Sequence, residues 1–240
     1  MRPALLAALL GVVACGPAAK VDEEIEAPAF IDPLVADSAH YLLEFENDHV
    51  RVLRERLAGG EGGAMHSHRD RVQVYLNDAD VTIVPRGGEP VRVTLVAGST
   101  SWTGETTHQG LPIDPIENLS IELRDLTGED VPLPEPDAVL VDPEHHVVDF
   151  ENERVRVVRM TYAPGMKTPL HAHRIGFGVF LSDAHGRNIP QEGEPVDIQA
   201  TARSTFWTTG QPAHVTENLG EEDLAVVLVE MKKHPAASAE

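Results

Sequence analysis

Residues 45–52 read Phe45-Glu46-Asn47-Asp48-His49-Val50-Arg51-Val52, and residues 150–157 read Phe150-Glu151-Asn152-Glu153-Arg154-Val155-Arg156-Val157. The two copies begin 105 residues apart, and the same spacing relates the segment His66-Ser67-His68 to His171-Ala172-His173. A third histidine, His108, has a counterpart in His214 at nearly the same spacing. The chain therefore consists of two repeated units, and the duplication includes three histidines of each unit.

The composition limits what the chain can be. A unit near 105 residues has the size of one small domain, so 240 residues hold two units and short tails. The formal net charge of −20 argues against nucleic acid and anionic membrane surfaces as partners, because both require a basic face. The chain has one cysteine, so it has no intrachain disulfide and no thiolate metal site. Metal ligands must therefore be nitrogen and oxygen atoms.

The first residues indicate export. A short basic start, Met1-Arg2, precedes an apolar run that ends in Val12-Val13-Ala14-Cys15. The run is short for a membrane span and suits a signal peptide over residues 1–14. Its end resembles a bacterial lipobox, which implies lipidation of Cys15 and a protein anchored in the periplasm or at the cell surface. The alternative is a plain secretory signal in which Cys15 is incidental.

Strand-sized runs of β-branched and aliphatic residues, separated by turn residues, occur in both units. We expect strands at residues 50–57, 72–76, 80–84, 91–96 and 119–123, and at 155–162, 177–181, 196–200, 204–208 and 224–231. Helical periodicity is not sustained anywhere. The pattern predicts an all-β fold of two tandem antiparallel β-barrels of the jelly-roll form.

Proline and acidic residues mark the domain boundaries. Residues 131–144 are proline-rich and are interpreted as a semi-rigid linker. We accordingly expect an N-terminal domain at 40–130 and a C-terminal domain at 145–231. Residues 15–39 are expected to form a flexible tether and residues 232–240 an unstructured tail.

The repeated histidines point to metal binding. His66 and His68 lie two residues apart on one strand, so their side chains leave the same face, and His108 can approach from another strand. His171, His173 and His214 repeat this arrangement. Neutral imidazoles bind Fe, Mn, Ni or Zn, and three of them leave coordination positions open. Exposed strand histidines are the alternative interpretation, and His145, His146 and His185 are expected to be solvated.

The motifs resemble those of the cupin superfamily, and the duplication resembles a bicupin. Gly63 precedes the first His-x-His, Gly165 leads into the second, and Gly210-Gln211-Pro212-Ala213-His214-Val215-Thr216-Glu217-Asn218 matches the second cupin motif. The resemblance covers roughly residues 40–125 and 145–231. It implies two double-stranded β-helix domains. It does not fix an activity, because one fold supports many functions.

The sequence departs from the family at the glutamate ligand that commonly follows the His-x-His pair. Gln73 stands at that position in the first unit and Gly178 in the second. Gln73 is a candidate fourth ligand, while Gly178 offers no side chain, so each site is expected to be a three-histidine set. Residues 109–117 are interpreted as an insertion between His108 and Asn118, because His214 and Asn218 are closer together.

Other residues near the histidines are weaker candidates for a role. Tyr75 shares a strand face with Gln73 and can hydrogen-bond a metal-bound ligand, although an inward tyrosine is more often part of the core. Arg54 and Arg159 correspond in the two units. They are candidates to hold a substrate carboxylate, or they belong to a charged outer face.

These features lead to two functional hypotheses. In the first, the chain is a metalloenzyme in which the two histidine sets hold Fe(II) or another divalent ion, and a small chelating molecule reacts there with O₂. Three-histidine iron sites of this kind resemble those of cupin dioxygenases. In the second, a lipid-anchored bicupin captures a small molecule or metal without turnover. Both are compatible with a homo-oligomer.

Overall fold

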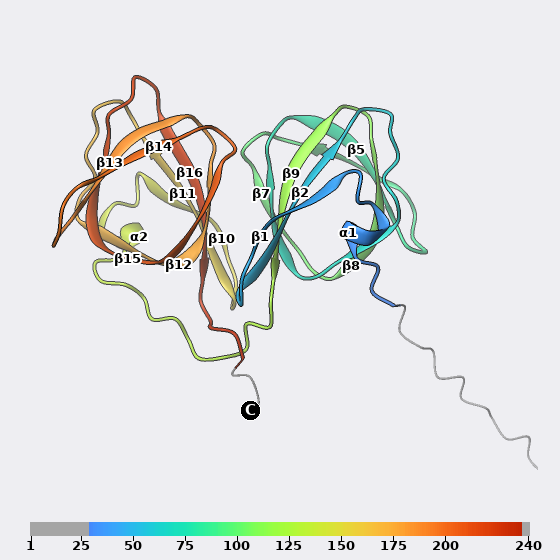
Figure 1. Ribbon diagram of the computed structural model, residues 1–240, viewed down its shortest axis with the longest axis horizontal. Helices are drawn as coiled ribbons and strands as arrows, with labels where there is room; N and C mark the ends of the chain where they lie inside the picture. The colour runs from blue at the N-terminus through green and yellow to red at the C-terminus, as the bar shows by residue number, and fades with distance from the viewer. Residues whose placement is uncertain (1–28, 237–240) are drawn as a thin grey trace, which may run out of the picture.

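The structure is a computed structural model that describes residues 29–236, and it contains two β-barrels side by side (Figure 1). The first barrel comprises α1 (Pro33–Ala36), β1 (Tyr41–Glu46), β2 (Val50–Leu57), β3 (His66–His68), β4 (Arg71–Tyr75), β5 (Ala79–Pro85), β6 (Val91–Leu95), β7 (Thr100–Thr103), β8 (Thr106–Pro112) and β9 (Ile116–Leu123). The second comprises α2 (Ala138–Val141), β10 (His146–Glu151), β11 (Val155–Tyr162), β12 (His171–Phe180), β13 (Ala184–Pro190), β14 (Val196–Ala200), β15 (Thr205–Asn218) and β16 (Leu224–Met231). Each run that was expected to be a strand overlaps one of these.

Both barrels share one antiparallel topology. In the first, a sheet in the order β1-β2-β9-β4-β7 lies over a second sheet in the order β3-β8-β5-β6. In the second, one sheet runs β10-β11-β16-β12-β15-β13-β14. The two sheets are joined there because β12 is continuous where the first barrel has the separate strands β3 and β4, and β15 is continuous where it has β7 and β8. The predicted all-β fold of two tandem antiparallel barrels is confirmed.

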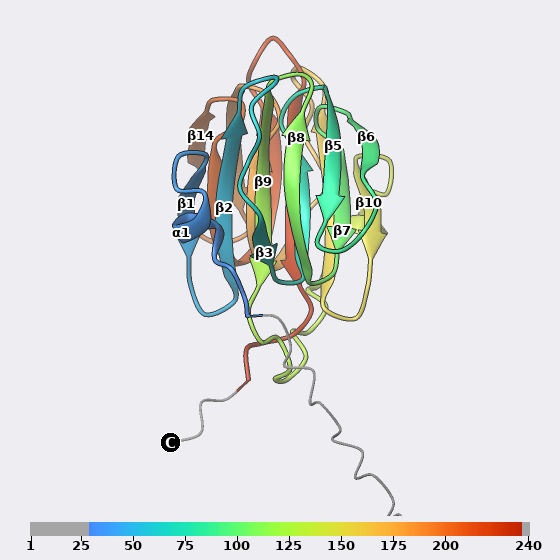
Figure 2. The same cartoon turned by 90° about the vertical axis from the view of Figure 1, so that its right-hand side faces the viewer.

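The largest hydrophobic cluster lies between the barrels. It contains alternate residues of equivalent strands, such as Val50 and Val52 of β2 and Val155 and Val157 of β11, all fully buried. Strand alternation places these valines on the outer face of one sheet in each barrel, and the two faces pack together. Each buried valine contributes roughly 1.5–3 kcal/mol relative to exposure. Figure 1 shows the two barrels facing each other across this interface, and in Figure 2 β1 and β10 lie at opposite edges of the molecule.

Arg54 and Arg159 connect the barrels in equivalent ways. Arg54 pairs with Glu44, with Nε 2.5 Å from Oε2, and donates to the carbonyl of Arg203 in the other barrel at 2.8 Å. Arg159 pairs with Asp149 at 2.6 Å and donates to the carbonyl of Gly98 at 2.8 Å. The sequence suggested that these arginines bind a substrate carboxylate or belong to a charged outer face. Instead, both form hydrogen bonds between the two barrels.

The first barrel begins earlier than the sequence suggested. Asp32 caps α1 by accepting from the amide of Leu34 and binds Arg51 at 2.8 Å. The second barrel repeats this 105 residues later, where Asp137 caps α2 and binds Arg156 at 2.6 Å. Helix α1 therefore lies within the expected tether at 15–39 and α2 within the expected linker at 131–144, so both expectations are wrong for these residues.

The residues after β16 are also ordered. The amide of His234 donates to the carbonyl of Glu129, and that of Ala236 donates to Asp125. Residues 232–236 thus pair with the segment that follows β9, at the lower end of both barrels in Figure 2, and are not an unstructured tail. The expected signal peptide and Cys15 lie outside the described residues. None of the helices among the described residues is long and apolar enough to cross a membrane.

Candidate metal centres

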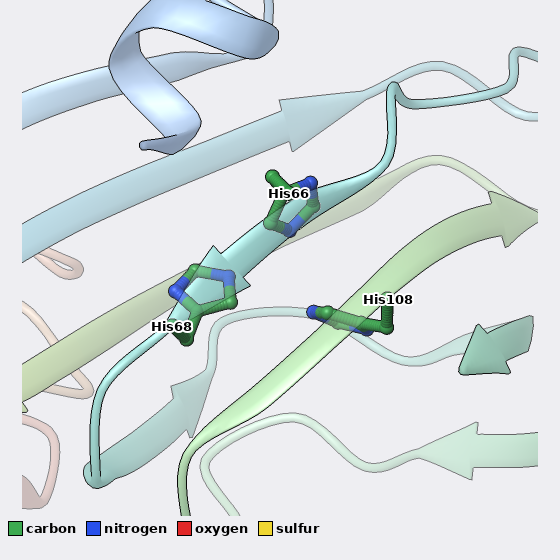
Figure 3. A group of neighbouring side chains, drawn as sticks. All are labelled: His66, His68 and His108. Atoms are coloured by element: carbon green, nitrogen blue, oxygen red, sulfur yellow. The ribbon is translucent and has the colours of Figure 1, made fainter. Parts of the chain in front are cut away.

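Strands β3 and β8 bring three histidines of the first barrel together (Figure 3). His66 pairs directly with His108 across the two strands, and His68 lies on the same face of β3. The ring centroids are 4.8 Å apart for His66 and His68, 4.8 Å for His66 and His108, and 5.4 Å for His68 and His108. One nitrogen of each ring lies within 4.8 Å of the others. The predicted convergence of the three imidazoles is present in the structure.

The segment before α1 holds the short strand β3 in place. The amide of Ser67, between the two histidines, donates to the carbonyl of Ile31 at 2.7 Å. The second barrel repeats the contact, because the amide of Ala172 donates to the carbonyl of Pro136 at 2.8 Å. The segments expected to be tether and linker therefore help to fix the His-x-His pairs.

Hydrogen bonds fix which nitrogen faces the centre. Nδ1 of His66 lies 2.8 Å from the carbonyl oxygen of Ala64, and Nδ1 of His68 lies 2.7 Å from Oε1 of Glu122. Because these partners are acceptors, each Nδ1 carries the hydrogen and each Nε2 keeps its lone pair. Nε2 of His108 is buried without a partner among the described residues. Such a set of inward lone pairs fits a divalent metal.

Burial keeps these imidazoles neutral. It lowers the pKa of His68 well below 6.5 and that of His66 in the same direction, and it lowers the pKa of His108 to about 3. Burial raises the pKa of Glu122 to about 7, against the opposing charges of Arg51 and Arg71. Neutral imidazole is the form that binds metal, so the site is prepared for an ion at neutral pH.

A cavity of about 480 Å³ reaches His108 inside the first barrel. Its wall contains Arg71, which is 2% exposed and donates from Nη1 to Thr106 at 3.0 Å. Nε of Arg71 is buried without a partner among the described residues. Glu55, which is 8% exposed, also lines the cavity, and its Oε2 accepts from Nδ2 of Asn118 at 2.8 Å. The sequence did not indicate that Arg71 and Glu55 line a cavity, because a strand pattern does not distinguish a charged side chain that points inward from one that points outward.

Gln73 and Tyr75 line the same cavity, but their polar groups are already hydrogen-bonded to each other and to neighbouring side chains. Oε1 of Gln73 accepts from Thr103 at 3.0 Å and from the hydroxyl of Tyr75 at 3.5 Å, so its lone pairs are already used. This disfavours Gln73 as a fourth ligand. The Tyr75 hydroxyl lies 2.9 Å from Oγ of Ser101, which matches the core role more closely than contact with a metal-bound ligand.

The second barrel contains four histidines at the equivalent place. His171 pairs across strands β12 and β15 with His214, at a ring separation of 4.5 Å, and lies 5.0 Å from His173. His146 on β10 is fully buried, with its ring 4.6 Å from that of His171. The expectation that His146 is solvated was wrong. The 105-residue spacing aligns it with Tyr41, which the repeat could have revealed.

Hydrogen bonds to Nδ1 also orient the histidines of the second barrel. Nδ1 of His171 faces the carbonyl of Pro169 at 2.9 Å, and Nδ1 of His214 faces that of Pro212 at 2.9 Å. Nδ1 of His173 lies 3.3 Å from Oε1 of Glu230. Burial lowers the pKa of His171 to about 2, and those of His146 and His214 to about 4. Nε2 of His171 is buried without a partner among the described residues.

Glu122 and Glu230 are equivalent carboxylates that the sequence motifs did not indicate. Glu122 faces Arg51 across β2 and β9, and Glu230 faces Arg156 across β11 and β16. Burial alone would raise the pKa of Glu230, but hydrogen bonds from His173 and Arg156 outweigh it and lower that pKa. The only signal in the sequence is one acidic residue within an otherwise apolar strand end.

The expected insertion after His108 is not present. Ile116 pairs with Leu57 at the start of β9, and Leu224 pairs with Tyr162 at the start of β16, so Asn118 corresponds to Val226 rather than to Asn218. Residues 109–117 continue β8 and turn into β9. The sequence alignment of the two asparagines was wrong because it ignored strand register.

Comparisons with known proteins agree with this architecture. No family model matches the chain. Auxin-binding protein 1 of Arabidopsis thaliana is 34% identical over 86 residues, 32% of this chain and 42% of that protein, so the match spans less than half of this curated relative. Oxalate decarboxylase from Bacillus subtilis has a TM-score of 0.52 at 14% identity, over 78% of this chain and 70% of that one. AerE from Microcystis aeruginosa has a TM-score of 0.52 at 11% identity, over 81% and 98% of the two chains. The chain therefore has the fold of these solved structures, with two β-barrels in tandem, as the resemblance of its motifs to the cupin superfamily implied.

Proposed function

We propose that the first barrel is a metal-dependent enzyme site of the oxygenase class for a small, acidic, metal-chelating molecule. The observation that carries this proposal is Arg71, a buried guanidinium on the wall of the cavity that reaches His108. Its Nε has no partner among the described residues. Because a buried charged donor is costly without an acceptor, a carboxylate of the substrate is the expected partner.

His66, His68 and His108 would hold the metal, which is Fe, Mn, Ni or Zn. Three neutral ligands leave the ion its full charge and several open positions, so it would supply Lewis acidity and, as Fe or Mn, redox chemistry. Arg71 orients the substrate carboxylate. The cavity walls formed by Val81, Ile83 and Leu95 exclude water from the reacting group.

Glu55 supplies the proton-transfer group. It is a buried carboxylate on the wall of the cavity, and the bond from Asn118 holds one of its oxygens in place. A base in this position can take a proton from a hydroxyl or enol of the substrate and return it to the product. Sequence reasoning found no base near either histidine set, so Glu55 strengthens the enzyme hypothesis.

Two relatives guide the choice of test molecules. The fold resembles that of oxalate decarboxylase, and another structure of that enzyme, with a TM-score of 0.51 at 14% identity, concerns its Mn(II) centres. This supports the inclusion of oxalate and Mn²⁺. The relative named as an auxin-binding protein supports the second candidate function, which is capture of a small acid without turnover.

The decisive experiment combines binding and turnover. Anaerobically purified protein is loaded with Fe²⁺ or Mn²⁺ and assayed for oxygen uptake and CO₂ release with oxalate, hydroxyacids, diketones and thiols. We expect turnover of an acidic chelator, retained binding without turnover in Glu55→Gln, and weakened binding in Arg71→Met. Tight binding without any product would favour capture. Absence of both binding and turnover would refute the proposal.

We also propose that the protein is exported and anchored through a lipid on Cys15. The apolar run and the Val12-Val13-Ala14-Cys15 sequence support this. Metabolic labelling with a radioactive fatty acid should mark the wild type, and Cys15→Ser should abolish the label. A labelled Cys15→Ser protein, or an unlabelled wild type, would contradict the anchor.

A further inference from the structure

We infer that the second barrel binds its metal with four histidines in a closed site that admits no further ligand and stabilises the fold. The inference shares with the proposed function the premise that the histidine clusters bind metal. It differs in assigning the two barrels different tasks, although their sequences are copies of one unit.

His146 is oriented as a fourth ligand. Its Nδ1 lies 3.1 Å from the carbonyl of Asp142 and 3.4 Å from Oδ2 of the same residue, so Nδ1 carries the hydrogen and Nε2 faces inward. One nitrogen each of His146, His171 and His173 lies within 4.8 Å of the others. His214 stands beside this group of three as the fourth imidazole: its ring is 4.5 Å from that of His171 and 5.8 Å from that of His173, and its Nδ1 faces the carbonyl of Pro212.

The Nε2 of His146 accepts from the hydroxyl of Tyr162 at 2.8 Å. Metal and hydroxyl compete for the same lone pair, so metal binding replaces one neutral hydrogen bond with a coordination bond. The backbone carbonyl of Asp142 then holds the imidazole from the outside, in the way that backbone acceptors orient histidine ligands in metal sites.

The first barrel has no fourth histidine at this position. Strand register equates His146, which pairs with Met160, with Tyr41, which pairs with Glu55. The Tyr41 hydroxyl lies 3.1 Å from Nε2 of His66. The first barrel thus offers three imidazoles and the second offers four, which fill the coordination that zinc prefers in structural sites.

The interior of the second barrel also differs from that of the first. Gly178 faces Phe206 across β12 and β15, where the first barrel has Gln73 facing Ser101. A Cβ at residue 178 would overlap the Phe206 ring, so the absent side chain is what admits the phenyl group. That ring packs against Phe180 at 5.2 Å, in the place of the polar wall of the first cavity.

The anion-binding group is missing as well. Gly176 pairs with Thr208 and Glu230, whereas Arg71 pairs with Thr103 and Glu122, so Gly176 replaces Arg71. A Cβ at residue 176 would overlap the backbone of β16. The open hollow of about 940 Å³ in this barrel is lined by Phe206 and by none of the four histidines among its described lining residues. An acidic ligand in this hollow would therefore meet none of these four histidines and no arginine at the position of Arg71.

The test uses the full chain with one site removed at a time. The double variant His66→Ala/His108→Ala leaves the second site, and His171→Ala/His214→Ala leaves the first. Each is loaded with Zn²⁺ for release kinetics against a chelator and with Co²⁺ for visible absorption, which is intense for four-coordinate cobalt and weak at higher coordination. Circular dichroism and thermal melting confirm folding.

In the chain that retains the second site, we expect about one metal, slow release, intense Co²⁺ absorption and no spectral response to added oxalate. His146→Gln in this background should speed release about 10-fold or more and weaken the absorption. His146→Tyr, which copies the first barrel, should act in the same direction. Tyr162→Phe should retain the metal, because only the competing hydroxyl is lost. The reciprocal variant Tyr41→His should slow release from the first site.

The outcomes separate the two proposals. If His146→Gln leaves release and absorption unchanged, or if oxalate changes the Co²⁺ spectrum of the second site, the closed four-histidine site is refuted and the function of the first barrel stands. The same holds if the second site binds no metal while the first does. A chain that binds no metal at either site refutes both.

Discussion

Glu122 holds His68 from behind: its Oε1 lies 2.7 Å from Nδ1 of the imidazole, and both side chains are almost fully buried. The pair fixes the ring orientation and the tautomer of a candidate ligand. Glu230 and His173 form the same pair in the second barrel at 3.3 Å. Because the pair survives in both copies, we regard the carboxylate as part of each metal centre.

Glu122→Gln should therefore lower metal affinity of the first site by about 10- to 100-fold, since the amide binds the imidazole less strongly and leaves its tautomer less defined. The affinity is measured by competition with a chelator in the chain that lacks the second site. Glu89→Gln, in the exposed loop between β5 and β6, serves as the matched control for loss of one negative charge. Equal affinities of the wild type and Glu122→Gln would refute the role of this pair.

Arg71→Met should leave the metal content of the first site unchanged and weaken binding of a small carboxylate by roughly 10- to 100-fold, the value of a hydrogen bond to a charged group. Calorimetric titration of the metal-loaded protein with oxalate measures the change. The exposed Arg92, which pairs with Asp80, provides the control variant Arg92→Met. Unchanged ligand affinity in Arg71→Met would remove the substrate class proposed for the first barrel.

Much of this site could be predicted from the sequence, because the repeat fixed both the strand pattern and the six histidines. His146, Arg71, Glu55 and Glu122 were missed for physical reasons. In the sequence of an alternating strand, a charged residue that points into the barrel looks the same as one that points outward. Only the pairing register of the strands shows which residue faces the histidines. The asparagine alignment failed for the same reason, since Asn118 and Asn218 occupy different strands of the two barrels.

The metal-free protein should lose stability as the pH falls from 6.5 to 5. Burial depresses the pKa of His108 to about 3 and of His171 to about 2, so below pH 6.5 the unfolded chain binds protons that the folded chain does not. By linkage, each such histidine costs roughly 2 kcal/mol at pH 5. Glu122, whose pKa is raised to about 7, opposes this trend, so Glu122→Gln should steepen it.

Urea unfolding of metal-free protein at pH 7, 6 and 5 measures this dependence. Most carboxylates stay ionised in this range, so the histidines dominate the slope. His171→Gln, with one fewer buried imidazole, should show a shallower decline than the wild type. A free energy of unfolding that stays constant between pH 7 and pH 5 would contradict the neutral, buried state of the histidines.

Phe45→Ala should destabilise both barrels together by about 3 kcal/mol, the low end for a phenylalanine because Phe45 is only partly buried. Phe45 packs at 5.6 Å from Phe177 and stacks at 5.8 Å on Trp207, both in the other barrel, so its removal leaves a cavity in the shared core. Phe150→Ala, the equivalent change, should have a similar cost. Thermal melting should show one transition in each variant, and two separate transitions in the wild type would contradict the shared core.

The central claim is that both histidine clusters hold metal but with unequal ligand sets. Elemental analysis of anaerobically purified protein, together with the two single-site variants, tests it most directly. We predict about two divalent metals per chain, falling to about one in His66→Ala/His108→Ala and in His171→Ala/His214→Ala. Chelator should remove the ion of the first site faster than that of the second. Less than about one-tenth of a metal per chain after loading with excess Zn²⁺ would contradict the claim, as would equal release rates from the two sites.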